Sequence, residues 1–472
     1  MRVLIACEGG NGMGLGHITR CLALYRALER KGVTPVTVIR GDGAVKKILG
    51  RQRCEIFDWI KEKDRFLSMA SGSDIVVVDS YHASKRLCEE ISRRAIKALY
   101  IDDYKRIPYP AGTVVNGTIG AERFNYPKTH GVSYLLGAKY IPIRKEFCGA
   151  GERKIRKSIR NMLITFGGTD KGIFTAKLLK VLKERFPGLR YQIASGKKNF
   201  SGPAKLRKLM MLSDLCISAG GQTLYELASC GLPAVGISFA ENQTLNLKGF
   251  RRSGFLKYAG RHTDPDIFNK VADAITAFSG PDARREASTA GANLIDGKGS
   301  LRVAEYLLDS LPPKILVRRA VKSDCGRIWR WRNDPRTRRS SFDGKMIPYE
   351  EHEKWFTRIL GDGRTRIYIG ENGADERVGQ ARLESMNDGS KAYIHVNLNP
   401  GFFGKGIGCK LIRAASEAFC SEHRNMRSIF AEVISDNAAS ITAFLKAGYG
   451  FYGKSRVGGR RVVILRYVIG RR

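Results

Sequence analysis

The stretch RVLIACEGGNGMGLGHITRC, residues 2–21, joins a short apolar run to a glycine-rich loop and then to a helical pattern. The apolar run predicts a buried strand. After the loop, apolar residues recur at the spacing of one helix face, at Ile18, Leu22, Tyr25 and Leu28. Further apolar runs bounded by polar residues follow, namely VTPVTVIR (33–40), DIVVVDSY (74–81) and KALYIDDY (97–104). Short strands that alternate with helices are typical of a parallel, doubly wound sheet, so the predicted fold class is α/β.

The alternation of predicted strands and helices begins again near residue 160, and the pattern changes after residue 312. Strand, glycine and helix patterns recur in NMLITFGGTD (161–170), DLCISAGGQTLYELASCG (214–231) and PAVGISF (233–239). The run Leu311-Pro312-Pro313-Lys314 then marks a break, and the last part spaces its strands as an antiparallel meander around one helix that starts at residue 407. We therefore expect two similar open sheets, residues 1–150 and 151–312, with a ligand cleft between their carboxyl edges, and an α+β domain over residues 315–472.

Composition limits the function classes. The 472 residues carry a net charge of +37. Such a charge is expected of a protein that binds nucleic acid or small anionic substrates, and also of a protein from a generally basic proteome. The basic residues are spread along the chain without a nucleic-acid-binding module, so no specific nucleic-acid partner is expected. No apolar run is long enough for a membrane span, and the N-terminus reads as a first strand, not as a signal peptide. Ten scattered cysteines without a CxxC pair predict reduced thiols in a cytoplasm and no zinc site.

The glycine loop resembles a nucleotide-binding loop but differs from each known type. A GxGxxG motif counted from Gly12 needs glycine at position 17, where His17 stands, and the Lys and Ser/Thr of a phosphate-binding P-loop are missing. A helix N-terminus after such a loop still suits a phosphate group. His17 lies just inside that helix, where the helix dipole favours the neutral form of the ring. It is either a general base or a residue that packs on the loop or binds phosphate passively.

The second sheet contains a comparable junction. The segment 218–223, SAGGQT, follows a strand and precedes a helix, and Glu226 lies in that helix. Its carboxylate can accept both ribose hydroxyls, while the backbone of Gly220 and Gly221 and the side chain of Thr223 hold a diphosphate. Glu226 can equally be an ordinary carboxylate in the first turns of a helix. Together the two junctions predict a nucleotide-sugar, bound by its nucleotide in the second sheet and presented to His17.

These stretches resemble the UDP-2,4-diacetamido-2,4,6-trideoxy-β-L-altropyranose hydrolases of pseudaminic acid synthesis, which are relatives of MurG-type glycosyltransferases with the GT-B fold. The resemblance covers nearly all of residues 1–312 and lies in GLGHITR (14–20), VVDSYHAS (77–84), YIDDY (100–104), YLLGAKYIPIRKEF (134–147), ITFGGTD (164–170) and ISAGGQTLYELASCGLPAVGISFAENQ (217–243).

The resemblance implies a GT-B pair of domains and a metal-free reaction in which water, activated by His17, expels UDP. It implies His17, Tyr81 and Asn242 as the catalytic residues. The implied substrate-binding residues are Gly14, Gly16, Arg20, Asp79, Gly167, Gly168, Gly220, Gly221, Thr223, Glu226 and Gln243. The alternative is a MurG-like glycosyltransferase, which needs an acceptor in order to release UDP.

The segment VNLNPGFFGKGIGCKLIR, residues 396–413, places alternating glycines between a strand end and a helix start. Such glycines expose successive N–H groups to a pyrophosphate. With FAEVISDNAASITAFLKAGYGF (430–451) after it, the region resembles the GNAT N-acetyltransferases. The resemblance implies acetyl-CoA as co-substrate, held by Val396, Leu398, Gly404, Lys405, Gly406, Ile407, Gly408 and Asn437.

The acetyltransferase region departs from its family in two places. Phe403 stands where Arg or Gln is usual in the phosphate loop, and Phe444 replaces the usual general-acid tyrosine. Tyr449 or Tyr452 can take that role, or the thiolate leaves without a positioned acid, and both tyrosines can simply pack in the core. His352 and Glu384 are candidate bases for the incoming amine, and each can equally be structural.

The two resemblances fit consecutive steps of one pathway. They imply a bifunctional enzyme that N-acetylates a UDP-4-amino-4,6-dideoxy sugar and then removes UDP from the diacetamido product. The alternative pairs a glycosyltransferase with an acetyltransferase of other specificity. The expected partners are UDP-amino-sugar substrates, with no membrane, and the oligomeric state stays open, a monomer included.

Overall fold

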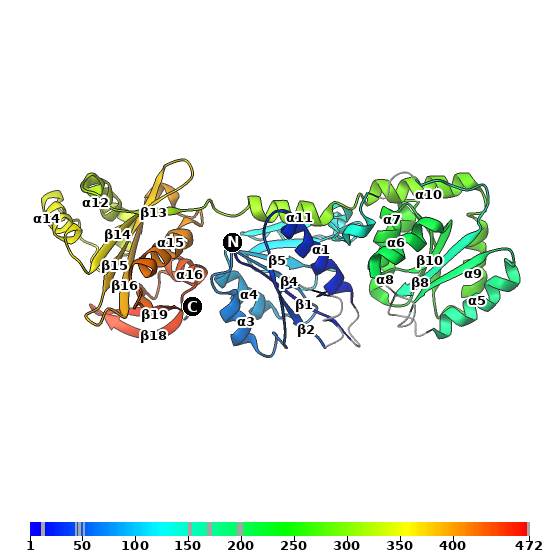
Figure 1. Cartoon of the computed structure of the whole chain (residues 1–472), viewed down its shortest axis with the longest axis horizontal. Helices are drawn as coiled ribbons and strands as arrows, with labels where there is room; N and C mark the ends of the chain where they lie inside the picture. Colours follow the sequence, from blue (N-terminus) through cyan, green and yellow to red (C-terminus); the bar gives the residue numbers. More distant parts are fainter. Residues whose placement is uncertain are drawn as a thin grey trace.

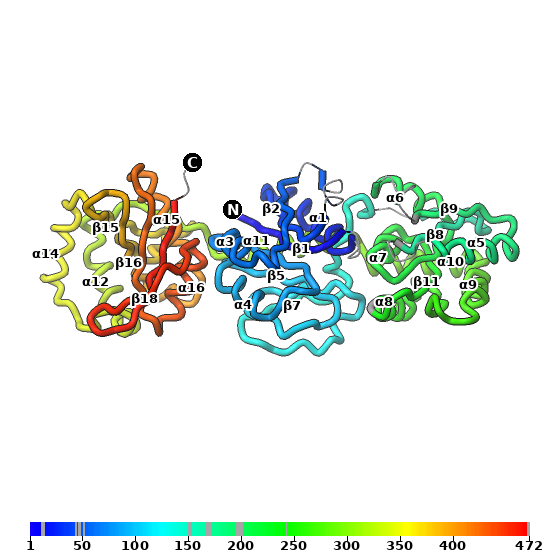
Figure 2. The backbone as a smooth tube through the Cα atoms, turned by 90° about the horizontal axis from the view of Figure 1, so that it is seen from below, coloured from blue at the N-terminus to red at the C-terminus, as the bar shows by residue number. Residues whose placement is uncertain are grey.

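A computed structural model describes residues 1–10, 15–42, 45, 49–50, 52–149, 153–167, 172–195 and 202–469. Three sheets lie in a row along the long axis of the molecule (Figures 1 and 2), with the N-terminal sheet in the middle. The mixed α/β architecture with parallel sheets, followed by a separate α+β domain, confirms the predicted fold class in this coarse form.

The first sheet has seven parallel strands in the order β3-β2-β1-β4-β5-β6-β7. Its strands are β1 Val3–Glu8, β2 Val36–Arg40, β3 Cys54–Ile56, β4 Ile75–Asp79, β5 Lys97–Ile101, β6 Gly112–Asn116 and β7 Val132–Leu136. Its helices are α1 Gly16–Arg30, α3 Lys63–Ala70 and α4 Lys85–Arg94, with short 3-10 turns η2 Ala121–Arg123, η3 Ala138–Tyr140 and η4 Lys145–Phe147. Apolar side chains cover both faces of the sheet, as the continuous hydrophobic runs of its strands require.

The second sheet has five parallel strands in the order β12-β11-β10-β8-β9. The strands are β8 Asn161–Gly167, β9 Arg190–Ser195, β10 Leu215–Ala219, β11 Ala234–Ser238 and β12 Leu256–Arg261. The helices are α5 Ile173–Arg185, α6 Gly202–Leu212, α7 Gln222–Ser229, α8 Glu241–Arg252, α9 Ile267–Thr276 and α10 Pro281–Leu294.

Helix α11, Gly299–Asp309, lies within the range that the sequence assigned to the second sheet, yet it packs on the first. The hydrophobic core that α1 forms with the first sheet also includes Val303, Ala304 and Leu307 of α11. Figure 1 shows α11 running along the middle domain toward the third. The first domain is therefore closed by a helix that comes after the second domain in the chain.

The third domain has a mixed sheet in the order β13-β14-β15-β16-β17-β19-β18. The strands are β13 Leu316–Arg319, β14 Thr365–Glu371, β15 Arg377–Ser385, β16 Lys391–Leu398, β17 Ser428–Ile434, β18 Gly450–Val457 and β19 Arg460–Val468. The helical segments are η5 Lys322–Asp324, α12 Cys325–Asn333, α13 Pro335–Arg339, α14 Tyr349–Leu360, η6 Pro400–Phe402, α15 Ile407–Glu422 and α16 Ala438–Ala447. Strands β14, β15 and β16 form the antiparallel meander that the sequence predicts.

The third domain packs directly on the first. Asp74, which precedes β4, accepts hydrogen bonds from Lys410 (2.8 Å) and Arg413 (2.9 Å), both on α15. On α16, Lys446 donates to the carbonyl oxygen of Ile96 at 3.3 Å. The acetyltransferase-like domain is thus docked on the first sheet by charged contacts and not only joined to it by the linker.

Candidate active sites

His17 lies in the first turn of α1, directly beyond the carboxyl end of β1. Its Nδ1 is 2.5 Å from Oδ1 of Asp79, the last residue of the neighbouring strand β4. Both side chains are buried, with His17 8% and Asp79 0% exposed. Because parallel strands end at the same edge of the sheet, residues 62 positions apart meet at this edge.

Arg20 follows one helical turn after His17 and faces the same way. Its guanidinium donates to both oxygens of Asp79, at 2.5 and 2.6 Å, and to Asp103 at 2.7 and 3.0 Å. Burial alone raises the pKa of Asp79, but Arg20 and then His17 outweigh it and hold the pKa well below its usual range. Asp79 is therefore a permanent carboxylate.

Tyr81 completes this cluster. Its hydroxyl donates to Asp103, and its ring meets the ring of His17 edge-on, with centroids 4.4 Å apart. The backbone N–H of Tyr81 donates to the buried carboxylate of Glu8 at 2.8 Å. Burial, and then the charge of Asp103, raise the pKa of Tyr81, so its hydroxyl keeps its proton.

The cluster has the geometry of an oriented base. Asp79 accepts a hydrogen bond from Nδ1 of His17, which fixes the tautomer that leaves Nε2 with a lone pair. No described residue forms a hydrogen bond with Nε2. The carboxylates of Asp79 and Asp103 both contact the guanidinium of Arg20, so these three side chains together carry one net negative charge. A proton gained by His17 would neutralise that charge. The sequence predicts that Arg20 and Asp79 bind substrate; in the structure they bond to each other and to His17 and Asp103, and the predicted substrate contact stays a prediction.

The second sheet brings Gly220, Gly221 and Thr223 together at the start of α7. A Cβ on Gly220 would lie 2.6 Å from the carbonyl oxygen of Gln243, so that glycine is needed for packing against α8. Gly221 has open space where a Cβ would be, which leaves room for a ligand. The side-chain oxygen of Gln243 accepts from the N–H of Phe239 at 3.0 Å.

Glu226 forms a buried ion pair that the sequence does not reveal. Arg144 donates to both of its oxygens at 2.6 Å, and Glu226 is 1% exposed. Burial raises the pKa of Glu226 and Arg144 opposes that shift. A ribose can use Glu226 only by competing with Arg144, so the predicted role of Glu226 stays a prediction.

A hydrogen-bonded chain connects the two halves. The hydroxyl of Tyr225 on α7 accepts from the N–H of Ile119 in the first domain at 3.3 Å and donates to Asn246 at 2.6 Å. Asn246 in turn donates to the carbonyl oxygen of Gly220 at 3.0 Å. The segment after β6 in the first domain is therefore in direct contact with α7, which follows the glycine junction of the second domain.

Some predicted residues are only partly described. Gly14 and Gly168 lie outside the described residues, and Gly167 and Asn242 are described only as members of β8 and α8. Gly16 is the first residue of α1. Asp103 and Arg144 were missed, although both lie in the stretches YIDDY and YLLGAKYIPIRKEF. The two consecutive carboxylates that follow the buried strand β5, Asp102 and Asp103, were the available signal for Asp103.

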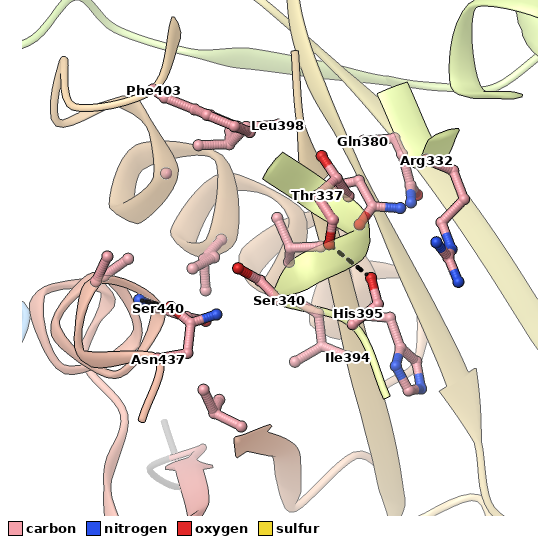
Figure 3. Close-up of a pocket in the computed structure, with 18 of the residues that line it drawn as sticks. Arg332, Thr337, Ser340, Gln380, Ile394, His395, Leu398, Phe403, Asn437 and Ser440 are labelled. Atoms are coloured by element: carbon pink, nitrogen blue, oxygen red, sulfur yellow. Dashed lines mark hydrogen bonds between the residues drawn. The ribbon is translucent and has the colours of Figure 1, made fainter. Parts of the chain in front are cut away.

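The third domain contains a cavity of about 870 Å³. Strands β16 and β17 pair in parallel only at Lys391–Tyr393 with Ser428–Phe430 and then diverge, and both strands line the cavity beyond that point. Seven of the eight residues predicted to bind acetyl-CoA line this cavity: Val396, Leu398, Gly404, Gly406, Ile407, Gly408 and Asn437. Lys405 does not line it, and its ammonium instead lies 5.1 Å from the ring of Phe402. Figure 3 shows Asn437, which caps the N-terminus of α16, and Ser440 of α16 across the pocket from Gln380, Arg332 and His395.

The glycine loop of this domain, Gly404–Gly408, contains backbone conformations that favour glycine. Gly404 and Gly406 have φ values of 76° and 71°, which other residues rarely adopt, and Gly406 caps the N-terminus of α15. Phe403, which replaces the usual polar residue, packs under the guanidinium of Arg336 at 4.9 Å. A cation from α13 thereby stands at the loop where a pyrophosphate is expected.

The candidate acids and bases differ in whether they line the cavity. Phe444 lines the cavity, whereas Tyr449 is fully buried with its hydroxyl 2.8 Å from that of Ser416, and Tyr452 is 55% exposed. His352 lines the cavity, and Glu384 is not among the lining residues.

The sequence reading missed His395, which projects from β16 into the cavity. Its ring is open to the cavity, yet surrounding protein atoms, and then Arg382, lower its pKa to about 4. No local signal marked it, because neighbours on a strand point to opposite faces and the prediction for Val396 therefore says nothing about His395.

Comparisons with known proteins agree with the third domain. Residues 314–450 match the family model of the GNAT acetyltransferase domain, which supports an enzyme. A solved structure of the aminoglycoside acetyltransferase AAC(6')-Ib with coenzyme A is 20% identical and covers 33% of this chain and 95% of its own, with a TM-score of 0.30.

Three curated relatives match larger parts of the chain. The uncharacterised protein MJ1062 of Methanocaldococcus jannaschii is 22% identical over 97% of this chain and 98% of its own length. A Helicobacter pylori protein named pseudaminic acid cytidylyltransferase and UDP-2,4-diacetamido-2,4,6-trideoxy-β-L-altropyranose hydrolase is 26% identical over 56% of this chain and 49% of its own. The spore coat polysaccharide biosynthesis protein SpsG of Bacillus subtilis is 22% identical over 66% of this chain and 98% of its own.

No helix in the described part of the chain combines the length and apolar character of a membrane span. The same residues contain no cluster of three or more His, Cys, Asp or Glu side chains suited to a metal ion.

Proposed function

We propose that the chain is a bifunctional enzyme of amino-sugar biosynthesis. Its third domain transfers an acetyl group from acetyl-CoA to the 4-amino group of a UDP-4-amino-4,6-dideoxy sugar. Its first two domains then hydrolyse the resulting UDP-2,4-diacetamido-2,4,6-trideoxy sugar to UDP and the free sugar. The sequence resemblance, the name of the Helicobacter relative and the match to the GNAT model support this pairing of activities.

For the hydrolysis, His17 acts as the general base. Nε2 takes a proton from water, the oxygen attacks the anomeric carbon, and the bond from that carbon to the UDP oxygen breaks. Asp79 holds the ring and stabilises the imidazolium, and Arg20 holds Asp79. Asp79 and Arg20 are positioning residues here, while Tyr81, in edge contact with His17, borders the place where the sugar would lie.

For the acetylation, the loop Gly404–Gly408 and the start of α15 would hold the pyrophosphate of acetyl-CoA. The diverging strands β16 and β17 would hold its pantetheine arm. His395 is neutral at pH 7 and lies on β16, so it can take the proton that the amine loses as the new amide bond forms. Because Phe444 has no hydroxyl, the thiolate of CoA leaves without a proton from that position.

The observation that carries the proposal is the buried His17–Asp79 pair at the carboxyl edge of the first sheet, in a chain whose third domain matches an acetyltransferase model. The test is a His17→Ala variant supplied with acetyl-CoA and the UDP-4-amino sugar. Release of CoA and of UDP is followed separately. Release of CoA should be unchanged, and release of UDP should fall by about 100-fold or more.

The matched control is His130→Ala, at an exposed turn before β7. This variant should retain both activities. Undiminished UDP release by His17→Ala would contradict the hydrolytic mechanism. UDP release that appears only when a second sugar or lipid acceptor is added would instead establish the glycosyltransferase alternative.

A further inference from the structure

The third domain docks on the amino edge of the first sheet, where strands β4 and β5 begin. Asp74 directly precedes β4 and accepts hydrogen bonds from Lys410 and Arg413 of α15. Ile96 directly precedes β5, and its side chain belongs to the hydrophobic core of the third domain. The carbonyl oxygen of Ile96 accepts from Lys446 of α16. Because neighbouring parallel strands begin at the same edge, these contacts form one docking surface.

The docking surface combines several kinds of contact. A Cβ added to Gly72 would lie 3.1 Å from the Cα of Gly448, so the two domains meet backbone to backbone at this point. Leu311, in the segment that connects the domains, packs against the hydrophobic cores of both. Helices α4 and α16 also lie against each other. The third domain is therefore held at this edge by backbone, apolar and charged contacts, and it is not a module that swings freely on its linker.

The hydrolytic cluster lies at the opposite edge of the same two strands. Asp79 is the last residue of β4, and Asp103 follows the end of β5 by two positions. Strand β4 spans about 16 Å from Asp74 to Asp79 at the usual rise per residue. Every residue of β4 is buried, and protein interiors are close-packed. The interior of the first domain therefore separates His17 from the third domain, and a nucleotide-sugar has to travel around the outside.

The acetyltransferase cavity has its acceptor side away from the first domain. The residues predicted to bind acetyl-CoA line the side formed by β16, the loop before α15 and the start of α16. The remaining lining includes Arg332 of α12 and Glu351 and Trp355 of α14, which leaves that side for the acceptor. Helices α12 and α14 lie at the end of the molecule far from the first domain, whereas α15 and α16 face it (Figures 1 and 2). A product that leaves on the acceptor side therefore enters solution at this far end.

We propose that the acetylated nucleotide-sugar is released into solution and then binds at the hydrolytic site of any copy of the chain. Joining the two activities on one chain fixes equal numbers of the two sites, and it does not pass the intermediate directly between them. This inference rests on the proposed function, because it requires both reactions. It also means that the acetylated nucleotide-sugar forms a free pool on which a second enzyme of the cell can act.

The first test follows label through the wild-type chain, which is supplied with the UDP-4-amino sugar and with acetyl-CoA labelled in its acetyl group. Unlabelled UDP-diacetamido sugar is added in about tenfold excess over the labelled product, so the labelled fraction of the released free sugar should fall by about tenfold. Direct passage would instead keep the new intermediate at a high effective concentration beside the second site, and the label would stay undiluted.

The second test mixes two variants that each lack one activity. His17→Ala retains acetyl transfer, and His395→Gln retains hydrolysis. When each intact site has the same concentration as in the wild type, the mixture should release free sugar at the wild-type rate and after the same lag. Because the lag reflects filling of the free pool, it should shorten in inverse proportion to the concentration of the chain. The matched control mixes His130→Ala and His423→Gln, which leave both sites intact.

The possible failures are distinguishable because each reaction is also measured alone, as CoA release and as UDP release from the unlabelled pool. Undiluted label, or a mixture that is slower than the wild type while its control is not, would overturn the inference and leave the proposed function in place. A wild type that transfers no label to the sugar, or releases no UDP from the pool, would overturn the proposed function and the inference with it. If a variant does not fold, dilution of the label in the wild type decides alone.

Discussion

The two candidate sites differ in how their polar groups are paired. Around His17, both oxygens of the carboxylates of Asp79 and Asp103 are occupied by Arg20, and Tyr81 adds a further hydrogen bond to Asp103. In the acetyltransferase cavity, the buried ends of Thr337, His352 and Gln380 have no described partner. The hydrogen bonds of the first site are complete within the protein, whereas the second site leaves buried polar atoms unpaired among the described residues.

Under the proposed function, this difference fits what each site would have to do. A base that activates water must be held in one orientation and tautomer before the substrate arrives, and saturated hydrogen bonds achieve this. A site that selects among similar sugars must leave its own groups for the correct ligand to pair, because the wrong ligand then leaves them unsatisfied. We therefore expect substitutions around His17 to impair chemistry and folding together, and substitutions in the cavity to impair mainly binding and transfer.

The largest effect is expected at Asp79. Asp79→Asn keeps the shape but places a neutral amide against His17 and Arg20, so the histidine tautomer is no longer fixed and Arg20 loses a buried counter-charge. UDP release should fall by about 10³- to 10⁴-fold, as for other oriented His–Asp pairs. The free energy of unfolding of the first domain should fall by about 3 kcal/mol. Single-turnover UDP release and urea unfolding measure the two effects.

The control for this substitution is Asp309→Asn, at the exposed end of α11. It should change neither quantity. Wild-type UDP release by Asp79→Asn would show that the paired cluster is structural and that another residue activates water.

A smaller effect is expected at His395, in the second site. His395→Gln removes the neutral base from β16 but retains a side chain of similar size. Acetyl transfer, measured as CoA release at saturating acceptor, should fall by about 100-fold, and hydrolysis of an already diacetylated UDP-sugar should be unchanged. His423→Gln, at the end of α15 and outside the cavity, is the control. A loss in His395→Gln that appears only in KM would assign His395 to binding and leave His352 as the base.

The third effect concerns a paired cluster that does no chemistry, the contact of Asp74 with Lys410 and Arg413. Burial alone raises the pKa of Asp74, but Lys410, the N–H of Arg2 and Arg413 together lower it below 3.8. A carboxyl with a lowered pKa stabilises the fold above its unfolded pKa, and this contribution is lost as the pH falls through the folded pKa. Asp74→Asn should therefore cost about 2 kcal/mol at pH 7, with the difference from the wild type shrinking below about pH 4.

Hydrogen exchange in α4 and α16, which face each other across the domain contact, measures the effect of Asp74→Asn locally. Asp273→Asn on the exposed face of α9 is the control. A difference that does not depend on pH would show that the ion pairs contribute nothing and that the substitution acts through packing.

The sequence could predict the elements that depend on local patterns. The buried strands, the parallel sheets, the antiparallel meander and the glycine loop before α15 follow from periodicity and glycine placement, and the structure has them. The return of α11 to the first sheet could not be predicted, because Val303, Ala304 and Leu307 form an ordinary helical face that would fit either domain.

The candidate sites show the same limit. His17 was identifiable because an unusual residue follows the glycines in one local stretch. Its partners Asp79 and Asp103 lie 62 and 86 residues away, counted from residue numbers 17, 79 and 103, and only strand order brings them together. Thr337, Gln380 and His395 have no local signal of function at all. Their shared property, facing one cavity from three different elements, exists only in the folded chain.

The smallest effect is expected at Phe444, which lines the cavity where the family usually has a tyrosine. Phe444→Tyr adds a hydroxyl that can protonate the departing thiolate of CoA. Because a thiolate already leaves readily, CoA release should rise only by about threefold to tenfold, with UDP release unchanged. Phe451→Tyr, at a 60% exposed position on β18, is the control and should change nothing. A rise confined to Phe444→Tyr would mean that proton supply to sulfur limits transfer. No rise would place the slow step at attack by the amine.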